Sequence, residues 1–346
     1  MLEIDGSYGE GGGQLLRLAV ALAAITGTRV CITNIRARRD KPGLAPQHLT
    51  GVQAVGQLCC AKVEGLTLRS QKITFEPAML RGGDYRFDVG TAGSITLVLQ
   101  ALLPVMLAAQ MSCKVHIMGG TDIRQAPAAD YLRKVLIRLI ERLGGRITMQ
   151  VLRRGYYPRG GGEIELAVKP ATLVPTVFEA TGHIKAICGI THVANLSEHI
   201  ALRMKQAALD RLGAYATQAS FETQILGHEA AFGPGGAIVC WIEREHTVLG
   251  AARIAERGVC AEALGDAVGK ELAADIAAGA ALDVHAADQI LVYLALAGGG
   301  TFSTRSASLH ARTAMWLTEQ FLPVAFDVSE SAGLAHVTVT PRGKWP

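Results

Sequence analysis

The chain has 346 residues, of which 49% are hydrophobic and 18% are charged, and its net charge is +4. This composition excludes a mainly disordered chain, and the nearly neutral charge excludes a surface that is cationic throughout. Any contact with nucleic acid must therefore be confined to a local patch. The length is sufficient for two or more domains with a large buried core.

The cysteines and the apolar runs indicate the cellular compartment of the protein. The seven cysteines form no CxxC pair, and their odd number argues against a disulfide framework, so we expect reduced, mostly buried thiols in a cytoplasmic protein. The run at 15–27 resembles a signal-peptide core, but acidic rather than basic residues precede it. The run at 95–111 is short for a membrane span and contains a glutamine and a proline, so we predict a buried helix and no membrane partner.

The first predicted helix, at 11–27, follows a glycine-rich loop in the segment DGSYGEGGGQLLR. Such a loop is either a tight turn or an anion cradle, because the free N–H groups and the dipole at a helix start attract negative charge. It is not a Walker A motif, since the chain contains no GxxxxGK[ST]. A carboxylate in a phosphate cradle is repelled unless a cation mediates, so Glu10 is either a Mg²⁺ or Mn²⁺ contact or an ordinary solvated residue.

The next segment, NIRARRDKPGLAPQHL, concentrates positive charge in a proline- and glycine-containing loop. Arg36 and Arg39 belong to this loop, and Gln47 and His48 open the helix that follows it. Guanidinium groups suit phosphate, so the loop, joined by Arg17 from the first helix, predicts a polyanion site of limited size. A solvated basic loop is the alternative.

In the middle of the chain, RGGDYRFDVGTAGSITLVLQ again has glycines and a hydroxyl that open an apolar helix. Gln100 lies inside this helix, and a buried amide must be hydrogen-bonded, so it is either a packing contact or a ligand contact. In GGTDIRQAPAADY, Pro127 and Tyr131 are candidates to enclose a flat ring such as a purine, although a plain loop and helix start is the commoner role.

Near the carboxyl end, Asp288 and Gln289 begin a third apolar helix at 287–300. His310 follows in SASLHARTAMW, just inside a predicted helix start that Ser306 and Ser308 can cap. Its imidazole is either a polar residue of a first helical turn or a nucleophile aimed at a phosphate.

The predicted elements repeat. Each repeat has an apolar helix, then an amphipathic helix and a β-patterned stretch that ends near a proline. The apolar helices are at 11–27, 93–109 and 287–300, and the stretches that follow them are at 47–77, 130–170 and 309–341. The pattern predicts three units of strand, helix, strand, helix and a strand pair.

The spacing of the units indicates an insertion. The first two units are roughly 80 residues apart and the last two roughly 180, an excess the size of a small domain. We therefore predict a small α/β module at 184–277, inserted into a body formed by 1–183 and 278–346. Within it, 183–194 and 236–245 read as strands and 198–214 and 261–279 as helices. Fusion of unrelated domains is the alternative.

Taken in order, and with YYPRGGGE after the middle segment, these motifs resemble those of the RNA 3′-terminal phosphate cyclase family over essentially the whole chain. The resemblance implies an α/β (α+β) fold. In this fold, three βαβαββ-type units resemble the C-terminal domain of bacterial translation initiation factor three, and the third unit carries the inserted module.

The resemblance also implies a reaction in three steps. A histidine is adenylylated by ATP, the AMP passes to an RNA 3′-terminal phosphate, and the neighbouring 2′-hydroxyl closes a 2′,3′-cyclic phosphate. The cofactors implied are ATP and a divalent cation (Mg²⁺ or Mn²⁺), and the partner is RNA with a 3′-terminal phosphate. An imidazole with an ordinary pKa of about 6.5 is largely the free nucleophile near neutral pH.

By position, His310 matches the family's nucleophile, and Asp288 is a candidate to orient its ring. Glu10 matches an acidic residue near the metal and the triphosphate. The candidate ATP-binding residues are Gln100, Pro127, Tyr131, His285, Ala286, Ala287, Asp288 and Gln289. The candidate RNA phosphate-binding residues are Arg17, Arg36, Arg39, Gln47 and His48.

Two positions depart from the family pattern. His285 stands where a tyrosine is usual, and Ala314 stands where an asparagine often follows the threonine that Thr313 retains. Two other functions stay open. One is a non-catalytic RNA-binding paralogue in ribosome assembly, which would lack the nucleophile, and the other is an enolpyruvyl transferase-like enzyme with a related repeated fold. The sequence is compatible with a monomer or a homodimer.

Overall fold

A computed structural model describes residues 1–180 and 182–343. Three four-stranded sheets in it share one topology, in which the first two strands are parallel and the others antiparallel. The first sheet has the order β1-β2-β4-β3, the second β5-β6-β8-β7 and the third β9-β14-β16-β15. The predicted fold class, with three repeated units, is therefore confirmed.

The first two units are continuous in sequence. The first consists of β1 (Leu2–Asp5), α1 (Gly13–Thr26), β2 (Val30–Thr33), α2 (Pro46–Leu58), β3 (Lys62–Glu64) and β4 (Ile73–Glu76). The second consists of β5 (Gly83–Asp88), α3 (Ile95–Ala108), β6 (Cys113–Gly119), the joined helical segments α4 (Ala129–Tyr131), η1 (Leu132–Leu136) and α5 (Ile137–Arg142), β7 (Arg146–Arg153) and β8 (Gly162–Lys169). The segment η1 is a turn of π-helix that the sequence pattern does not predict.

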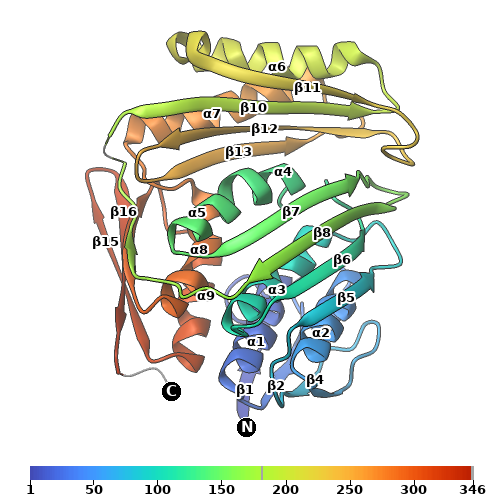
Figure 1. Cartoon of the computed structure of the whole chain (residues 1–346), viewed down its shortest axis with the longest axis vertical. Coiled ribbons are helices and arrows are strands. Elements are labelled where there is room, and N and C mark those ends of the chain that lie inside the picture. The colour runs from blue at the N-terminus through green and yellow to red at the C-terminus, as the bar shows by residue number, and fades with distance from the viewer. Residues whose placement is uncertain (181, 344–346) are drawn as a thin grey trace.

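The third unit begins with β9 (Thr176–Val177) and resumes with α8 (Val284–Leu296), β14 (Gly300–Thr304), α9 (Leu309–Phe321), β15 (Val324–Ser331) and β16 (Leu334–Pro341). Between β9 and α8 lie β10 (Ile184–Ala194), α6 (Glu198–Leu212), η2 (Gly213–Gln218), β11 (Ala219–Leu226), β12 (Gly235–Arg244), β13 (Val248–Ile254) and α7 (Ala261–Ala278). These elements form a fourth sheet, of order β11-β10-β12-β13, which α6 and α7 cover on one face (Figure 1). They also have a separate hydrophobic cluster.

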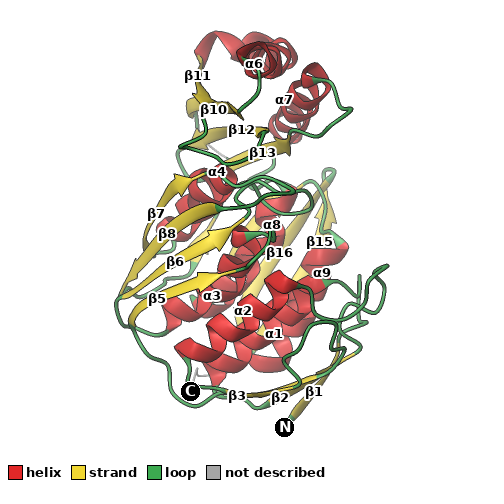
Figure 2. Cartoon of the chain, turned by 90° about the vertical axis from the view of Figure 1, so that its right-hand side faces the viewer, coloured by secondary structure: helices red, strands yellow, loops and turns green. Residues whose placement is uncertain are grey.

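The helices of the three units pack together inside the molecule, and the three sheets lie outside them (Figure 2). This position explains why α1, α3 and α8 are so apolar. Every residue of α3 except Gln100 and Ala108 is buried, and Ser94 caps the helix by accepting a hydrogen bond from the backbone N–H of Leu97. Gln100 is thus a polar group surrounded by an apolar helix, as the sequence indicates.

Two further features concern the cysteines and the longer helices. All seven cysteines are free, and Cys31, Cys59, Cys113 and Cys240 are buried. Within the part of the chain that the structure describes, no helix is both long enough and apolar enough to cross a membrane.

Candidate active site

A cavity of about 800 Å³ opens between the three units and the inserted module, a volume typical of small-molecule sites. Helices α1, α2, α3, α8 and α9 contribute to its lining, as do β13 and α7 of the module. The structure brings together in this cavity most of the residues expected from the sequence: Glu10, Arg17, Arg36, Arg39, Gln47, His48, Gln100, Pro127, Tyr131, His285, Asp288, Gln289 and His310.

His310 lies in the first turn of α9, and Ser308 caps that helix. The ring nitrogen Nδ1 is 2.7 Å from Oε1 of Gln14, and Nε2 of Gln14 donates to the backbone carbonyl of His310 at 3.3 Å. The amide oxygen therefore accepts from Nδ1–H, and the other ring nitrogen, Nε2, is left for a second partner. Burial lowers the pKa of His310 below its usual value of 6.5. The free base is thereby favoured near neutral pH.

Glu10 faces the other ring nitrogen of His310, with its Oε2 2.9 Å from Nε2 and 3.6 Å from Nη2 of Arg39. Its loop is held against α9 at two points. Tyr8 stacks on Trp316 with ring centroids 3.8 Å apart, and Gly9, at φ +61°, leaves no room for a side chain, because a Cβ there would lie 2.1 Å from Oγ1 of Thr313. The carboxylate and the imidazole are therefore held together by the packing of the loop.

The expectation that Asp288 orients the imidazole is wrong. Oδ1 of Asp288 accepts a hydrogen bond from Oγ of Ser308 at 2.5 Å, and the ring is held by Gln14 instead. Burial raises the pKa of Asp288 to about 6. Asp288 therefore acts on Ser308, the cap of α9, rather than on the ring of His310, which follows that cap by two residues.

A line of side chains connects the central helices of the three units. Nη2 of Arg17 donates to Oε1 of Gln100 at 3.2 Å, and Nε2 of Gln100 donates to Oε1 of Gln289 at 2.6 Å. Nε2 of Gln289 in turn donates to the backbone carbonyl of His285 at 2.9 Å. Gln100 is therefore both a packing contact and a residue of the cavity, so the two alternatives from the sequence are not exclusive.

The arginines differ in how much of their hydrogen-bonding capacity is free. Nε of Arg17 is buried without a partner, and burial lowers the pKa of this arginine to about 10. Nη1 of Arg36 is already occupied by the backbone carbonyls of Lys41 and Gly43, at 2.9 and 2.7 Å. Arg17 and Arg39 are therefore better placed than Arg36 to receive an anion, since Arg36 mainly holds its own loop.

His48 is 4% exposed, and burial beside Arg17 and Arg36 lowers its pKa to about 3. Its Nδ1 accepts from the backbone N–H of Ala45 at 3.2 Å, so the proton of the neutral ring is on Nε2. His48 can thus donate one hydrogen bond into the cavity but carries no charge there. Oε1 of Gln47 accepts from the backbone N–H of Ser94 at 2.9 Å, so this side chain links α2 to the start of α3.

The start of α8 is fixed from two sides by Asp283, which caps the helix. Oδ1 of Asp283 also accepts from the hydroxyl of Tyr131 at 2.6 Å, and Oδ2 accepts from the backbone N–H of Gly250 in β13 at 2.9 Å. Ala286 and Ala287 are buried in the core under this turn and do not line the cavity, which corrects the expectation that they contact a nucleotide.

His285 projects from the same turn toward the inserted module. Its Nε2 is 3.4 Å from Oε1 of Glu271, and Oε2 of Glu271 accepts from Nη2 of Arg253 at 2.7 Å. The hydrogen bond to Glu271 raises the pKa of His285. Where a tyrosine is usual in the family, this chain therefore has a ring that is paired with a carboxylate of the module.

No cluster of three or more metal-ligating side chains occurs among the described residues. Glu10 is the carboxylate next to His310 and Arg39. Mg²⁺ is commonly held by one or two carboxylates together with substrate phosphates rather than by an all-protein cage. The donor set thus fits a divalent cation that arrives with a phosphate ligand.

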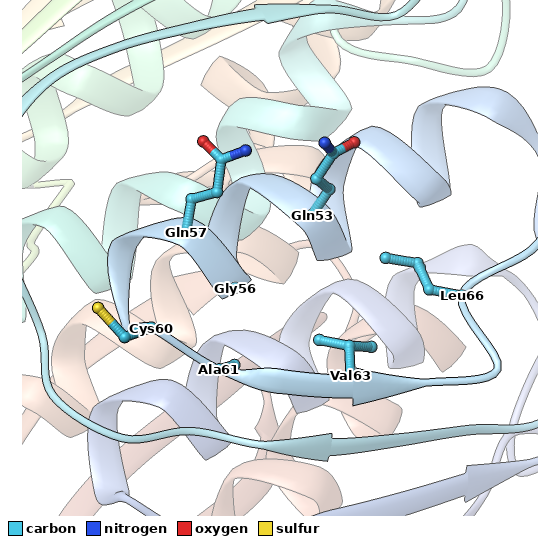
Figure 3. Close-up of a pocket in the computed structure, with 7 residues that line it drawn as sticks. All are labelled: Gln53, Gly56, Gln57, Cys60, Ala61, Val63 and Leu66. Atoms are coloured by element: carbon cyan, nitrogen blue, oxygen red, sulfur yellow. The ribbon is translucent and has the colours of Figure 1, made fainter.

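A second depression, of about 490 Å³, lies on α2 and β3 and shares no lining residue with the cavity (Figure 3). Its lining consists of Gln53, Gly56, Gln57, Cys60, Ala61, Val63 and Leu66. Its lining contains no imidazole, amine or carboxylate, and the exposed thiol of Cys60 is its titratable group.

Several cavity residues are not among those expected from the sequence. Gln14 follows Glu10 by four positions, and Arg124, Gln125, Ala126 and Ala128 lie in GGTDIRQAPAADY, so these residues belong to segments that the sequence already singles out. The side chains contributed by the module have no comparable signal, because only the folded chain brings them to the cavity. They are Ala252, Arg253, Ile254, Glu256, Val259 and Leu264.

The chain is similar to known proteins along nearly its whole length. The family model described as RNA 3′-terminal phosphate cyclase matches residues 8–328. A protein of that name from Nitrosospira multiformis is 52% identical over 99% of this chain and 97% of its own length. Proteins of the same name from Methanosarcina barkeri and Pyrobaculum neutrophilum are 42% and 43% identical, over 98% and 97% of this chain and 100% and 97% of their own. The chain therefore belongs to the RNA 3′-terminal phosphate cyclase family.

Proposed function

We propose that this protein uses ATP to convert an RNA 3′-terminal phosphate into a 2′,3′-cyclic phosphate, with His310 as the nucleophile. The observation that carries the proposal is the geometry of one ring. Nδ1 of His310 is bonded to Gln14, and Nε2 faces a cavity that also contains Arg17 and Arg39. An imidazole with one nitrogen anchored and the other, beside Glu10, on a cavity that holds two guanidinium groups is suited to attack phosphorus once its lone pair is free.

In the first step, Nε2 of His310 attacks the α-phosphorus of ATP. The P–N bond forms as the bond to the bridging oxygen breaks, and pyrophosphate leaves. Glu10 lies 2.9 Å from Nε2 in the free protein, so this carboxylate must withdraw before the lone pair is available. Glu10 would hold a divalent cation that arrives with the triphosphate, and the positive charge of that cation would offset the charge of the leaving group.

The phosphates of ATP have a suitable cradle at the start of α1. Gly12 occupies the N-cap of this helix without a side-chain cap, so the first backbone N–H groups are free, and the unpartnered Nε of Arg17 lies one turn further on. An uncapped helix start next to a buried guanidinium favours an anion. Pro127 and Tyr131 lie in the same cavity, where they can enclose the adenine.

In the second step, an oxygen of the RNA 3′-phosphate attacks the α-phosphorus, the P–N bond breaks, and His310 is restored. In the third step, the 2′-hydroxyl attacks the terminal phosphorus, loses its proton to a base, and AMP leaves. Arg39, Gln47 and the Nε2–H donor of His48 are the groups we assign to the RNA phosphate. The protein contributes mainly position and charge to these displacements.

Incubation with ATP labelled at the α-phosphate and a divalent cation tests the proposal. We expect an acid-labile AMP adduct that maps to His310, and no adduct on His310→Ala with the melting temperature retained. A labelled His310→Ala variant would mean another nucleophile. Failure of the wild type to label while RNA still binds would favour a non-catalytic RNA-binding role, and binding of phosphoenolpyruvate without an adduct would favour an enolpyruvyl transferase.

We also propose that residues 184–277 form one inserted domain within a body of residues 1–183 and 278–346, and that the protein is cytoplasmic. The separate sheet and hydrophobic cluster of the module support the division. Its last helix, α7, ends at Ala278, one residue beyond the proposed boundary.

A further inference from the structure

The motif YYPRGGGE has no part in the reaction proposed above, yet three consecutive residues in it, Tyr157, Pro158 and Arg159, are exposed. It forms the turn between β7 and β8, and Tyr157 at its tip is 77% exposed, more than any other large hydrophobic residue that the structure describes. Arg159 is exposed beside it and donates from Nη1 to the backbone carbonyl of Phe232 at 2.9 Å. A carbonyl is a neutral acceptor, so this bond leaves the positive charge of Arg159 available.

A second aromatic ring meets this turn from the inserted module. Phe232, on the loop between β11 and β12, is 45% exposed. The guanidinium of Arg153 lies over its ring, 4.1 Å from the centroid. Gly161 touches another part of the ring, since a Cβ at residue 161 would lie 2.6 Å from Cδ2 of Phe232. Arg153 also pairs with Glu163 and donates from Nε to the backbone carbonyl of Gly161 at 2.7 Å. Two segments far apart in sequence therefore present two rings and two guanidinium groups on one surface, and the guanidinium of Arg153 is already paired with a carboxylate.

This surface is continuous with the cavity. A Cβ at Gly160 would lie 2.8 Å from Cα of Ala92, so the turn touches the loop before α3. A Cβ at Gly93 in that loop would lie 3.2 Å from Cβ of Gln47, which lines the cavity. Only one loop therefore separates the exposed rings from the groups that we assign to the RNA phosphate.

We propose that Tyr157, Phe232, Arg153 and Arg159 bind the nucleotides that precede the terminal phosphate of the RNA. This inference rests on the proposed function, because it supplies the path by which the strand reaches His310. Proteins bind single strands by stacking bases on aromatic and guanidinium planes and by tracking the backbone with positive charge. The surface offers both, and its continuity with the cavity favours the substrate strand over a separate protein partner.

The proposal predicts that affinity depends on RNA length. A 3′-phosphorylated dinucleotide reaches only the cavity, whereas a dodecanucleotide also covers the two rings. The added affinity is tolerant of sequence, because every base has a face that can stack. A single exposed aromatic ring or a single exposed arginine is common on protein surfaces. The dependence of RNA affinity on RNA length is therefore the property that tests the proposal.

The test measures the dissociation constants of both RNAs by fluorescence anisotropy with the full chain. We expect Tyr157→Ala and Phe232→Ala each to weaken dodecanucleotide binding about 5- to 150-fold, the range for loss of one stacked base, and dinucleotide binding to be unchanged. Tyr157→Trp should retain the affinity. Arg159→Gln should reduce the slope of log affinity against log salt by about 0.7, as expected for one lost contact with a single strand.

Tyr215→Ala is the matched control. Tyr215 is 38% exposed in η2, at the opposite end of β11 from Phe232, a separation of about 25 Å along the strand. This variant should bind both RNAs as the wild type does. Melting temperatures establish that each variant is folded.

The outcomes separate this inference from the proposed function. If the wild type forms the AMP adduct and Tyr157→Ala binds the dodecanucleotide with unchanged affinity, the RNA surface is wrong; a protein partner at this surface would give the same result. If the wild type forms no adduct but the length dependence is present and is lost in Tyr157→Ala, the surface stands and the proposed reaction fails.

Discussion

Gln14 gives the His310 ring its direction. The amide accepts from Nδ1 at 2.7 Å and donates to the backbone carbonyl of the same residue, so it holds both the ring and the turn that carries it. Since Nε2 is the attacking atom in the proposed reaction, loss of this contact should misdirect the nucleophile without removing it.

We therefore expect Gln14→Leu to slow adduct formation about 100-fold at saturating ATP, the order of loss for a reacting group displaced by about an ångström. Gln57→Leu is the control, because Gln57 lies on the outer face of α2, away from the cavity (Figure 3). The measurement is the single-turnover rate of labelling. An unchanged rate in Gln14→Leu would mean that the ring is directed by other groups.

Gly13 allows the side chains of His48 and Arg17 to lie close to the backbone of α1. A Cβ at this position would lie 2.1 Å from Nε2 of His48 and 3.0 Å from Nη1 of Arg17. Gly13→Ala should therefore push both groups aside and abolish adduct formation while the melting temperature stays within a few degrees.

Gly51→Ala is the matched substitution, because a Cβ there meets nothing within 4 Å in the interior of α2. It should be neutral or stabilise the protein by about 0.5–1 kcal/mol, the ordinary gain for alanine over glycine in a helix. Equal activity losses in the two variants would show that the loss in Gly13→Ala does not arise from contact with His48 and Arg17.

At the scale of single residues, most of the cavity could be predicted because the relevant side chains lie in motifs with a physical meaning. Asp288 shows where the prediction failed. Its distance in sequence from His310 allows contact, but its carboxyl is engaged by Ser308, which no pattern indicates. Partners at 2–3 Å depend on rotamers, and periodicity does not determine rotamers.

Helix α9 depends on its cap for both stability and function. Oγ of Ser308 accepts from the backbone N–H of Ala311 at 3.0 Å and donates to Asp288. Ser308→Ala removes both bonds at the turn that carries His310.

We expect Ser308→Ala to lower the free energy of unfolding by about 1 kcal/mol, the usual cost of losing a cap, and to slow adduct formation. Ser197→Ala is the control, because Ser197 occupies the N-cap of α6 without a side-chain cap bond. Urea denaturation measures both variants. Equal destabilisation would contradict the capping role that we assign to Ser308.

At the scale of elements, the apolar helices and the β-patterned pairs could be predicted because their periods differ. The π-helical turn η1 could not, since a single extra residue per turn leaves the apolar pattern nearly intact. The short strand β9, Thr176–Val177, pairs with β14 across the whole insertion. A strand of two residues is too short to show an alternating pattern, so only the repetition of the unit predicts a strand at this position.

The module completes the cavity as well as interrupting the third unit. Gly250 donates to Asp283 at the start of α8, and Glu271 pairs with His285. The boundaries of the insertion follow from repeat spacing, whereas its contribution to the cavity depends on how it packs on the body. That packing also joins residues as distant as Arg142 and Glu245, which are 103 positions apart, and one sequence gives no signal for such a contact.

A buried charged cluster fixes the module to the second unit. Arg154 donates to Asp122 and Asp130 at 3.2 and 2.6 Å, and His192 of β10 is fully buried beside them. Nδ1 of His192 is 2.8 Å from the hydroxyl of Tyr156, whereas its Nε2 has no hydrogen-bond partner. Nε2 lies 4.0 and 3.9 Å from carboxylate oxygens of Asp122 and Asp130, which favour a second proton on the ring, whereas burial and the charge of Arg154 oppose it.

Burial and the charge of Arg154 lower the pKa of His192 to about 4. In the unfolded chain the pKa returns to about 6.5, so between these values the unfolded state binds a proton that the folded state excludes. Stability should therefore fall as the pH decreases from 6.5 to 4, by at most roughly 3 kcal/mol from this residue, since each pKa unit is worth about 1.4 kcal/mol.

Urea denaturation at pH 7 and pH 4.5 measures this effect in the wild type and in His192→Gln. The variant should lose most of this part of the pH dependence, whatever its absolute stability, because the group that takes up the proton is gone. His199→Gln, at an exposed position on α6, should keep the wild-type slope. The slope is the property to compare, since a buried glutamine also changes packing. If His192→Gln retains the full pH dependence, the proton enters elsewhere and the charged cluster does not couple the attachment of the module to pH.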